Sequence, residues 1–129
     1  SFPTRRSSDL DQKRYLQAKH YLNENQKIEL INDDAFLYEP TQKFDLIFID
    51  GPKSHQEKLI MHYAQFLKPS GLIVIDNMYL KKITESAQMT KQKKGLIKKI
   101  GDFRKWLKQN YPDQFSIIDI EDGIGIIRF

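Results

Sequence analysis

The chain has 129 residues, which is enough for one domain with a single hydrophobic core. Charged residues make up 29% and aromatic residues 12%, a composition that is not typical of disordered chains. No apolar run approaches the length of a membrane span, no signal-peptide pattern opens the sequence, and there is no cysteine for a disulfide framework, so we expect a cytoplasmic protein.

The first forty residues predict one helix and one strand. Residues 1–10 lack periodicity and look like translated sequencing-adapter read-through, so we expect a non-native tail there and one domain over residues 11–129. Residues 11–23 carry apolar side chains at helical spacing and predict a helix. Residues 28–31 predict a short strand that ends at a polar stretch containing Asp34.

Two apolar runs predict further strands: residues 44–49, in which Asp45 is the one polar residue, and residues 72–75. Because neither run alternates with polar residues, each is typical of a strand buried on both faces in a parallel sheet. Ser54 and Glu57 have the spacing of a capping box and predict a helix between the strands. Pro69-Ser70-Gly71 is expected to stop this helix.

The second half of the chain predicts a basic helix followed by a hairpin. After a loop at residues 77–90, the helix carries apolar residues on one stripe. Residues 115–120 and 124–129 predict two strands joined by the tight turn Glu121-Asp122-Gly123. The sequence therefore predicts an α/β fold with a mostly parallel sheet and a C-terminal antiparallel hairpin.

Polar side chains follow the two buried runs directly. Ligands of open α/β sheets lie beyond the carboxyl ends of parallel strands, where Asp50, Lys53, Asp76 and Asn77 would converge. The three oxygen donors suit a hard cation such as Mg²⁺, and the lysine could act as a base near neutral pH if it is partly desolvated. Aspartate and asparagine are also common turn and cap residues after strands, and spacing alone favours that interpretation.

Two other features have a structural and a functional interpretation. Asp34, with Ala35 behind it, could meet an adenine ring, but taken alone it is better explained as a cap for the segment that starts at Ala35. The lysine-rich stretch could gather phosphates, or it could be the solvated face of a helix, and both interpretations stay open. Its possible RNA contacts are Lys91, Lys93, Lys94, Lys98 and Lys99.

From about residue 11 to the end, the chain resembles the C-terminal two-thirds of a class I S-adenosylmethionine-dependent O-methyltransferase. It is similar to the metal-dependent group that includes catechol and caffeoyl-CoA O-methyltransferases and bacterial enzymes that methylate 5-hydroxyuridine in tRNA. The resemblance rests on residues 44–50 followed by Lys53, on residues 67–77, and on residues 122–126.

The resemblance implies a fold, a reaction and site residues. The fold would be a Rossmann-like methyltransferase sheet, and the reaction would be methyl transfer from S-adenosylmethionine to a hydroxyl of tRNA or of a small phenolic molecule. The implied metal ligands are Asp50, Asp76 and Asn77, with Mg²⁺ the expected ion, and the implied general base is Lys53. The implied cofactor-binding residues are Asp34, Ala35 and Asp50, and a homodimer also stays open.

The chain departs from this family pattern at its N-terminal side. The family's first two strands and its glycine-rich cofactor loop should precede residue 11, so we expect an N-terminally truncated domain. As given, the chain is expected to bind S-adenosylmethionine poorly, to be inactive, and to be marginally stable, because the strand at residues 44–49 would have an unpaired edge.

Three other protein classes share parts of this sequence pattern. A non-catalytic RNA-binding module is suggested by the lysine-rich helix and predicts salt-dependent binding that survives loss of Asp50 and Asp76. A receiver-type signalling domain would also place Asp34, Asp50 and Lys68 near one another, but the connection between the two aspartates is too short for it. An oxidoreductase on a nucleotide-binding fold has no supporting glycine loop in this sequence.

Overall fold

The computed structural model describes residues 8–22 and 29–129, in two compact units, Ser1–Thr41 and Gln42–Phe129. In the first unit, α1 spans Ser8–Leu22, so the predicted helix is confirmed and begins inside the segment interpreted as a tail. Nδ2 of Asn32 donates a hydrogen bond to the side-chain Oε1 atom of Gln12 at 2.6 Å, which connects the loop around Asn32 to α1.

The strand predicted at residues 28–31 does not form in the part that the structure describes. Ile28 lies outside the described residues, and Ile31 makes only a single bridge. Directly after it, the backbone turns: the carbonyl oxygen of Asp34 accepts hydrogen bonds from the amides of Leu37 and Tyr38, each at 2.9 Å. So short an apolar run, followed at once by turn residues, does not build a ladder.

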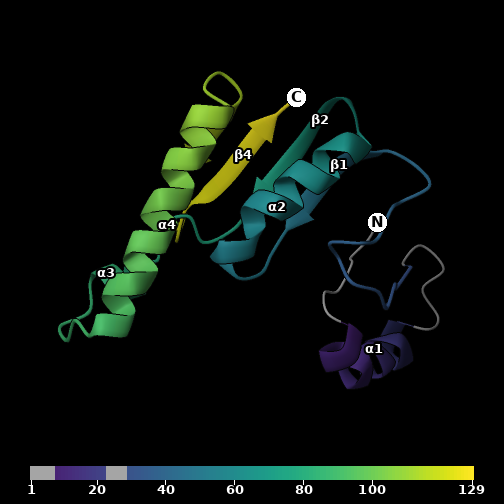
Figure 1. Ribbon diagram of the computed structural model, residues 1–129, viewed down its shortest axis with the longest axis horizontal. Coiled ribbons are helices and arrows are strands. Elements are labelled where there is room, and N and C mark those ends of the chain that lie inside the picture. The colour runs from purple at the N-terminus through teal and green to yellow at the C-terminus, as the bar shows by residue number, and fades with distance from the viewer. Residues whose placement is uncertain (1–7, 23–28) are drawn as a thin grey trace. The chain divides into compact units, whose positions relative to one another are not determined.

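The second unit contains the sheet (Figure 1). The strands lie in the order β1-β2-β4-β3, in which β1 and β2 are parallel while β4 is antiparallel to both β2 and β3. This confirms the predicted α/β class, the parallel pairing and the terminal hairpin. The elements are β1 (Phe44–Ile49), α2 (Lys53–Tyr63), the 3-10 turn η1 (Ala64–Phe66), β2 (Leu67–Ile75), α3 (Lys81–Thr84), α4 (Lys91–Asn110), β3 (Phe115–Ile118) and β4 (Ile124–Arg128).

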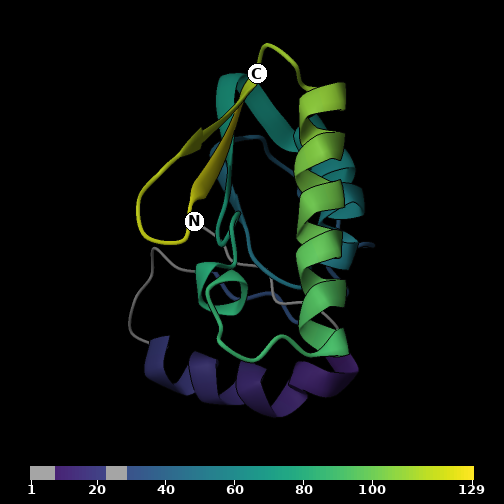
Figure 2. The ribbon, with the colours of Figure 1, turned by 90° about the vertical axis from the view of Figure 1, so that its left-hand side faces the viewer.

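Both long helices of this unit, α2 and α4, cover the same face of the sheet (Figure 2). The core between helices and sheet is formed by buried side chains of β1, β2, β4, α2 and α4, among them Ile47, Ile49, Ile60, Ile73, Ile75, Ile100, Phe103, Leu107 and Ile127. On the opposite face of β1, Leu46 and Phe48 are 49% and 48% exposed. The expectation that β1 is buried on both faces is therefore wrong for the described residues, because both helices lie on one side.

The junction between α2 and β2 differs from the predicted one. The helix ends at Tyr63, and β2 already begins at Leu67, so that Pro69 lies inside a strand. The pairing with β1 is irregular there: Leu67 pairs with Phe44 and Leu72 with Leu46, which leaves residues 68–71 opposite Asp45 alone. Proline is tolerated at such a bulge because its neighbours there do not continue the regular ladder.

The predicted capping box is wrong, whereas the predicted basic helix is confirmed. Because α2 begins at Lys53, Ser54 lies inside the first turn, and Pro52 occupies the N-cap position without a side-chain cap. Helix α4 has a side-chain cap, in which the hydroxyl of Thr90 accepts a hydrogen bond from the Lys93 amide at 3.2 Å. In the described ranges, 8–22 and 29–129, no helix is long and apolar enough to cross a membrane.

Candidate functional site

The site is built where β1 and β2 end. Ile49 pairs with Ile75 in the parallel register, so the residues that follow them, Asp50 and Asp76, lie beside each other at the carboxyl edge of the sheet. Lys53 opens α2 after a short turn, and its ammonium group donates a hydrogen bond to the carbonyl oxygen of Asp76. The predicted convergence of Asp50, Lys53 and Asp76 is thus present in the structure.

Two further contacts surround the Lys53 side chain. Its Nζ donates to the Oε1 atom of Gln56 at 3.3 Å and lies 5.8 Å from the centroid of the Phe103 ring on α4. Gln56 in turn donates from Nε2 to the carbonyl oxygen of Gly51 at 2.8 Å. The Lys53 amine is therefore surrounded by groups from the end of β2 and from the two helices, and Gln56 is in turn hydrogen-bonded to the turn after β1.

Burial lowers the pKa of Lys53 from 10.5 to about 8, because desolvation disfavours the charged ammonium form. The carboxylates of Asp76, Asp50 and Asp122 oppose this shift, since each stabilises the ammonium electrostatically. A lysine with a pKa of about 8 has a substantial neutral fraction near physiological pH, so it can accept a proton from a bound substrate.

Asn77 follows Asp76 in a left-handed backbone conformation, with φ of 56°. Its backbone amide donates to the Oδ1 atom of Asp76 at 2.7 Å, so one carboxylate oxygen is already used in a local turn. Asparagine adopts this conformation more readily than most residues. The turn interpretation of these residues and a binding role are thus compatible, since the side chains of Asp50 and Asn77 are exposed.

The oxygen atoms at the carboxyl edge of β1 and β2 are of the type that binds a hard cation. Asp50, Asp76 and Asn77 offer carboxylate and amide oxygens, which Mg²⁺ accepts alongside retained waters. The described residues contain no group of three or more His, Cys, Asp or Glu side chains placed to hold a metal ion, so a third protein ligand would have to be the Asn77 amide.

The turn of the β3–β4 hairpin organises the loop after β2. The backbone amides of Met78 and Tyr79 donate to the carbonyl oxygens of Gly123 and Asp122, at 3.1 and 3.0 Å. The Oδ1 atom of Asp122 also accepts from the Lys81 amide at 2.6 Å, at the start of α3. The hairpin thereby fixes the path of the chain that leaves Asp76 and Asn77.

Gly123 is expected to be intolerant of a side chain. Its φ is +83°, and an added Cβ would lie 2.6 Å from Cδ2 of the Tyr79 ring, so Gly123→Ala should destabilise the fold by about 1–3 kcal/mol. Gly95, inside α4 with open space around it, is the matched control, and Gly95→Ala should stabilise by about 0.5–1 kcal/mol. Denaturant unfolding measures both, and an unchanged stability of Gly123→Ala contradicts the expected strain.

The predicted adenine-binding residues lie in the other unit, and the structure describes them only within it. The Oδ1 atom of Asp34 accepts a hydrogen bond from the Phe36 amide at 2.9 Å, so the carboxylate caps the turn that begins at Ala35. The side chain of Ala35 is buried. The local geometry therefore matches the cap interpretation of Asp34.

The sequence comparison decides the family. A family model described as O-methyltransferase matches residues 6–129. The chain belongs to the O-methyltransferase family.

Solved structures share the fold of this O-methyltransferase family member. A proposed caffeoyl-CoA O-methyltransferase from Staphylococcus aureus superposes with a TM-score of 0.75 at 22% identity, over 97% of this chain and 62% of its own. A Podospora anserina methyltransferase bound to S-adenosylhomocysteine superposes with a TM-score of 0.74 at 18% identity, and the match covers 98% of this chain and 58% of that protein. An O-methyltransferase from Bacillus cereus, also bound to S-adenosylhomocysteine, superposes with a TM-score of 0.67 at 17% identity, and the match covers 98% of this chain and 61% of that protein.

A curated relative matches the sequence over a shorter segment. It is a proposed decarboxylating cobalt-precorrin-6B C(15)-methyltransferase from Thermoplasma volcanium, 31% identical over 67 residues, which are 52% of this chain and 33% of the relative. This family member thus spans about a third of that relative and about three-fifths of the solved structures.

Sequence reasoning missed two residues of the site in this O-methyltransferase family member. Gln56 lies in α2, where an isolated glutamine gives no periodic or motif signal, and its 1% exposure appears only in the structure. Asp122 is part of the predicted tight turn and of the family resemblance, but sequence reasoning assigned it no role in the site, and its carboxylate acts electrostatically on Lys53. The turn signal placed Asp122 in the hairpin, but nothing in the sequence indicated which loop that hairpin would meet.

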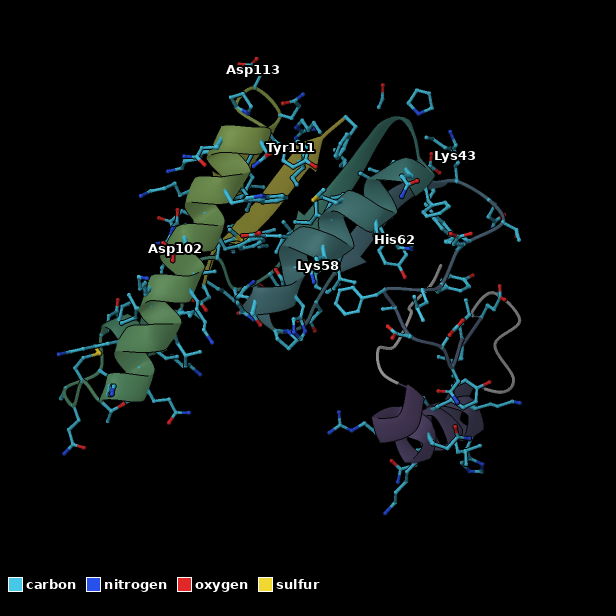
Figure 3. The ribbon with its side chains drawn as sticks, viewed as in Figure 1. Lys43, Lys58, His62, Asp102, Tyr111 and Asp113 are labelled. Atoms are coloured by element: carbon cyan, nitrogen blue, oxygen red, sulfur yellow. The ribbon has the colours of Figure 1, made fainter. Side chains whose placement is uncertain are left out.

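The predicted RNA-contacting lysines separate into two groups. Lys93 is half-buried, and its Nζ donates to the Ser86 hydroxyl at 2.7 Å and to the Gln88 carbonyl at 2.9 Å, so it holds the loop before α4. The other four are exposed, namely Lys91, Lys94, Lys98 and Lys99. On the outward side of the same helix, Asp102 lies 3.9 Å from Lys98 as an ion pair (Figure 3).

Proposed function

We propose that the protein transfers a methyl group from S-adenosylmethionine to a hydroxyl group of its substrate. The observation that supports this function most is the desolvated Lys53 amine at the carboxyl edge of parallel strands, where it donates to the Asp76 carbonyl and lies in the electrostatic field of the Asp76 and Asp50 carboxylates. In the reaction the bond between carbon and the sulfonium sulfur breaks, and a bond between carbon and the acceptor oxygen forms. The hydroxyl proton moves to Nζ of Lys53, and S-adenosylhomocysteine leaves.

Asp50, Asp76 and Asn77 would hold a divalent cation, for which we propose Mg²⁺. When bound, the cation would lower the pKa of the acceptor hydroxyl and orient it. The chain's own contribution is alignment: the parallel register fixes the two aspartates beside each other, and the Asp76 carbonyl holds the base next to them.

The cofactor contacts proposed for this chain are Asp34, Ala35 and Asp50. The backbone at Ala35 could meet a ring nitrogen of adenine, while the second carboxylate oxygen of Asp34 accepts from its amino group. Asp50 would lie near the cofactor because it follows β1 at the sheet's carboxyl edge. Calorimetry with S-adenosylmethionine on Asp34→Ala tests this part separately from the chemistry.

The function is tested by methyl transfer in the protein expressed from its complete reading frame. With Mg²⁺ and S-adenosylmethionine, Asp76→Ala is expected to lower the rate at least about 100-fold, because it removes a proposed ligand of the cation, while the backbone carbonyl that accepts from Lys53 remains. A chelator should have a similar effect on the parent protein. The control is Asp113→Ala, an exposed aspartate in the loop between α4 and β3 (Figure 3).

The outcomes separate the parts of this proposal. A parent rate that is insensitive to the chelator contradicts the metal, while the transferase function stands. Absence of methyl transfer to either a small catechol or a 5-hydroxyuridine-containing RNA, together with absence of S-adenosylmethionine binding, contradicts the function itself.

The acceptor we propose is a hydroxyl on RNA, such as tRNA 5-hydroxyuridine, with a small phenolic molecule as the alternative. The supporting observation is the row of exposed lysines on α4 formed by Lys91, Lys94, Lys98 and Lys105. Residues spaced three, four or seven apart share one face of a helix, and this face lies opposite the buried stripe of Ile100, Phe103 and Leu107. Such a row can contact successive phosphates.

The lysine row makes a salt-dependent prediction. Changing Lys94 and Lys98 together to glutamine should weaken binding of an anticodon stem-loop RNA and reduce the slope of log affinity against log salt by about 0.7–0.9 per lost contact. The control is Lys58→Gln, an exposed lysine on α2 (Figure 3). An unchanged slope favours the phenolic acceptor. RNA binding that survives Asp50→Ala and Asp76→Ala, without methyl transfer in the parent, favours a non-catalytic RNA-binding module instead.

A further inference from the structure

We propose that Gln56 is a positioning residue, which holds the Lys53 amine in a fixed direction at the carboxyl edge of β1 and β2. The inference rests on the proposed function, in which Lys53 accepts the proton of the acceptor hydroxyl. Gln56 does not reach the reacting atoms through this geometry; it acts through Lys53.

Gln56 is the buried polar side chain of the described core, with 1% of its surface exposed. Burial of a primary amide is costly unless its polar atoms are hydrogen-bonded, and here both ends are used. Nε2 donates to the Gly51 carbonyl at 2.8 Å, and Oε1 accepts from Lys53 at 3.3 Å. The two bonds fix the orientation of the amide, since reversing it would place the NH₂ group against the Lys53 donor.

Lys53 and Gln56 are three residues apart on α2, so their side chains leave the helix on the same face. A lysine side chain alone is a flexible four-carbon stem whose end rotates freely. Gln56 removes that freedom because it is itself anchored to the turn after β1, at Gly51. Gly51 itself has a φ of 145°, a conformation that residues with side chains rarely adopt.

Two acceptors fix the direction of the Lys53 amine. The carbonyl oxygen of Asp76, at the end of β2, and Oε1 of Gln56, on α2, each accept a hydrogen bond from Nζ. With the Phe103 ring 5.8 Å away on the α4 side, the amine is held in one orientation in which it can accept a proton.

The test compares Gln56→Met with Gln65→Met. Methionine has a similar length but cannot form either hydrogen bond, and Gln65 is an exposed glutamine whose amide donates only locally, to the His62 carbonyl at 3.0 Å. In protein with ¹³C-labelled lysine, expressed from the complete reading frame, relaxation of the Lys53 ε-methylene reports how tightly the amine is held. We expect a rigid methylene in the parent and in Gln65→Met, and a more mobile one in Gln56→Met, in which the hydrogen bond to the Asp76 carbonyl remains.

The relaxation measurement decides the proposal without enzymatic activity. A Lys53 methylene that stays rigid in folded Gln56→Met overturns it. If Gln56→Met does not fold, the reciprocal variant Lys53→Met is used, and the NMR chemical shifts of the Gln56 side-chain amide resonances are measured in it. These resonances should move when the lysine is lost, and unchanged resonances overturn the proposal.

Methyl transfer supplies the functional side of the test. Gln56→Met should lower kcat about 10- to 100-fold, with KM for S-adenosylmethionine changed less than about twofold, because only the direction of the base is lost. Unchanged kcat with a mobile lysine overturns the positioning role. If the parent itself transfers no methyl group, the proposed function fails, whereas the rigid methylene still tests the Gln56–Lys53 contact.

Discussion

Replacing Lys53 by methionine is expected to lower kcat for methyl transfer about 100- to 10,000-fold, the range typical of a lost general base. Methionine has a similar length and an apolar end that suits the neighbourhood of the Phe103 ring, which lies 5.8 Å from Nζ of Lys53, but it has no group to accept the proton. The fold should survive, because removal of a desolvated amine relieves a cost of burial. The measurement is single-turnover methyl transfer, accompanied by thermal unfolding to show that the variant is folded.

The pH dependence of the parent gives an independent check on the same residue. The neutral form of Lys53 accepts the proton, so the rate should rise with pH and level off once the pH exceeds the pKa, which burial lowers to about 8. A bound cation would lower this pKa further, so the rise should end at or below about pH 8. Lys53→Met should lose this rise.

Lys58 provides the matched control for this prediction. It is an exposed lysine on the same helix, so Lys58→Met removes the same charge without touching the site. Its kcat should equal that of the parent. If Lys53→Met retains the parent rate and the parent pH profile, then Lys53 is not the base, and its contacts serve only the packing of α2.

The local patterns of the sequence were sufficient for most of the fold. Strand β1 has the predicted bounds, because an apolar run between polar neighbours defines both of its ends. The beginning of β2 was missed because Pro69 and Ser70, read as a stop, lie in a bulge, where Ser70 takes a φ of 66°. Whether such residues end an element or distort it depends on the partner strand, which local sequence does not specify.

The candidate site was predictable in its position but not in its contacts. Strand ends in a parallel sheet meet at one edge, which was enough to bring Asp50 and Asp76 together. That Lys53 donates to the backbone of Asp76, and that Gln56 supports it, depends on how α2 packs on the sheet. The spacing of Lys53 and Gln56 along the helix gives no information about that packing.

Phe103 connects the core to the site, so its loss should have the largest effect on stability. Its side chain is 2% exposed and is among the largest that are fully buried. The Phe103 ring stacks on the Trp106 ring, with the two centroids 6.3 Å apart. Nζ of Lys53, on α2, lies 5.8 Å from the centroid of the Phe103 ring. Truncation leaves a cavity between α4 and the α2 side of the core, which the rigid sheet cannot fill.

Phe103→Ala is therefore expected to destabilise the protein by about 3–5 kcal/mol, a large part of the roughly 5–15 kcal/mol that stabilise a typical domain. Denaturant unfolding measures the loss, and Phe129→Ala is the control, because this phenylalanine is 41% exposed and should cost at most about 1 kcal/mol. The Lys53 side chain should also become more mobile in Phe103→Ala, since the ring that lies beside its amine is lost. A loss no larger than that of the control would mean that α4 does not pack over the carboxyl edge as the structure has it, and the desolvation that lowers the pKa of Lys53 would then have no source.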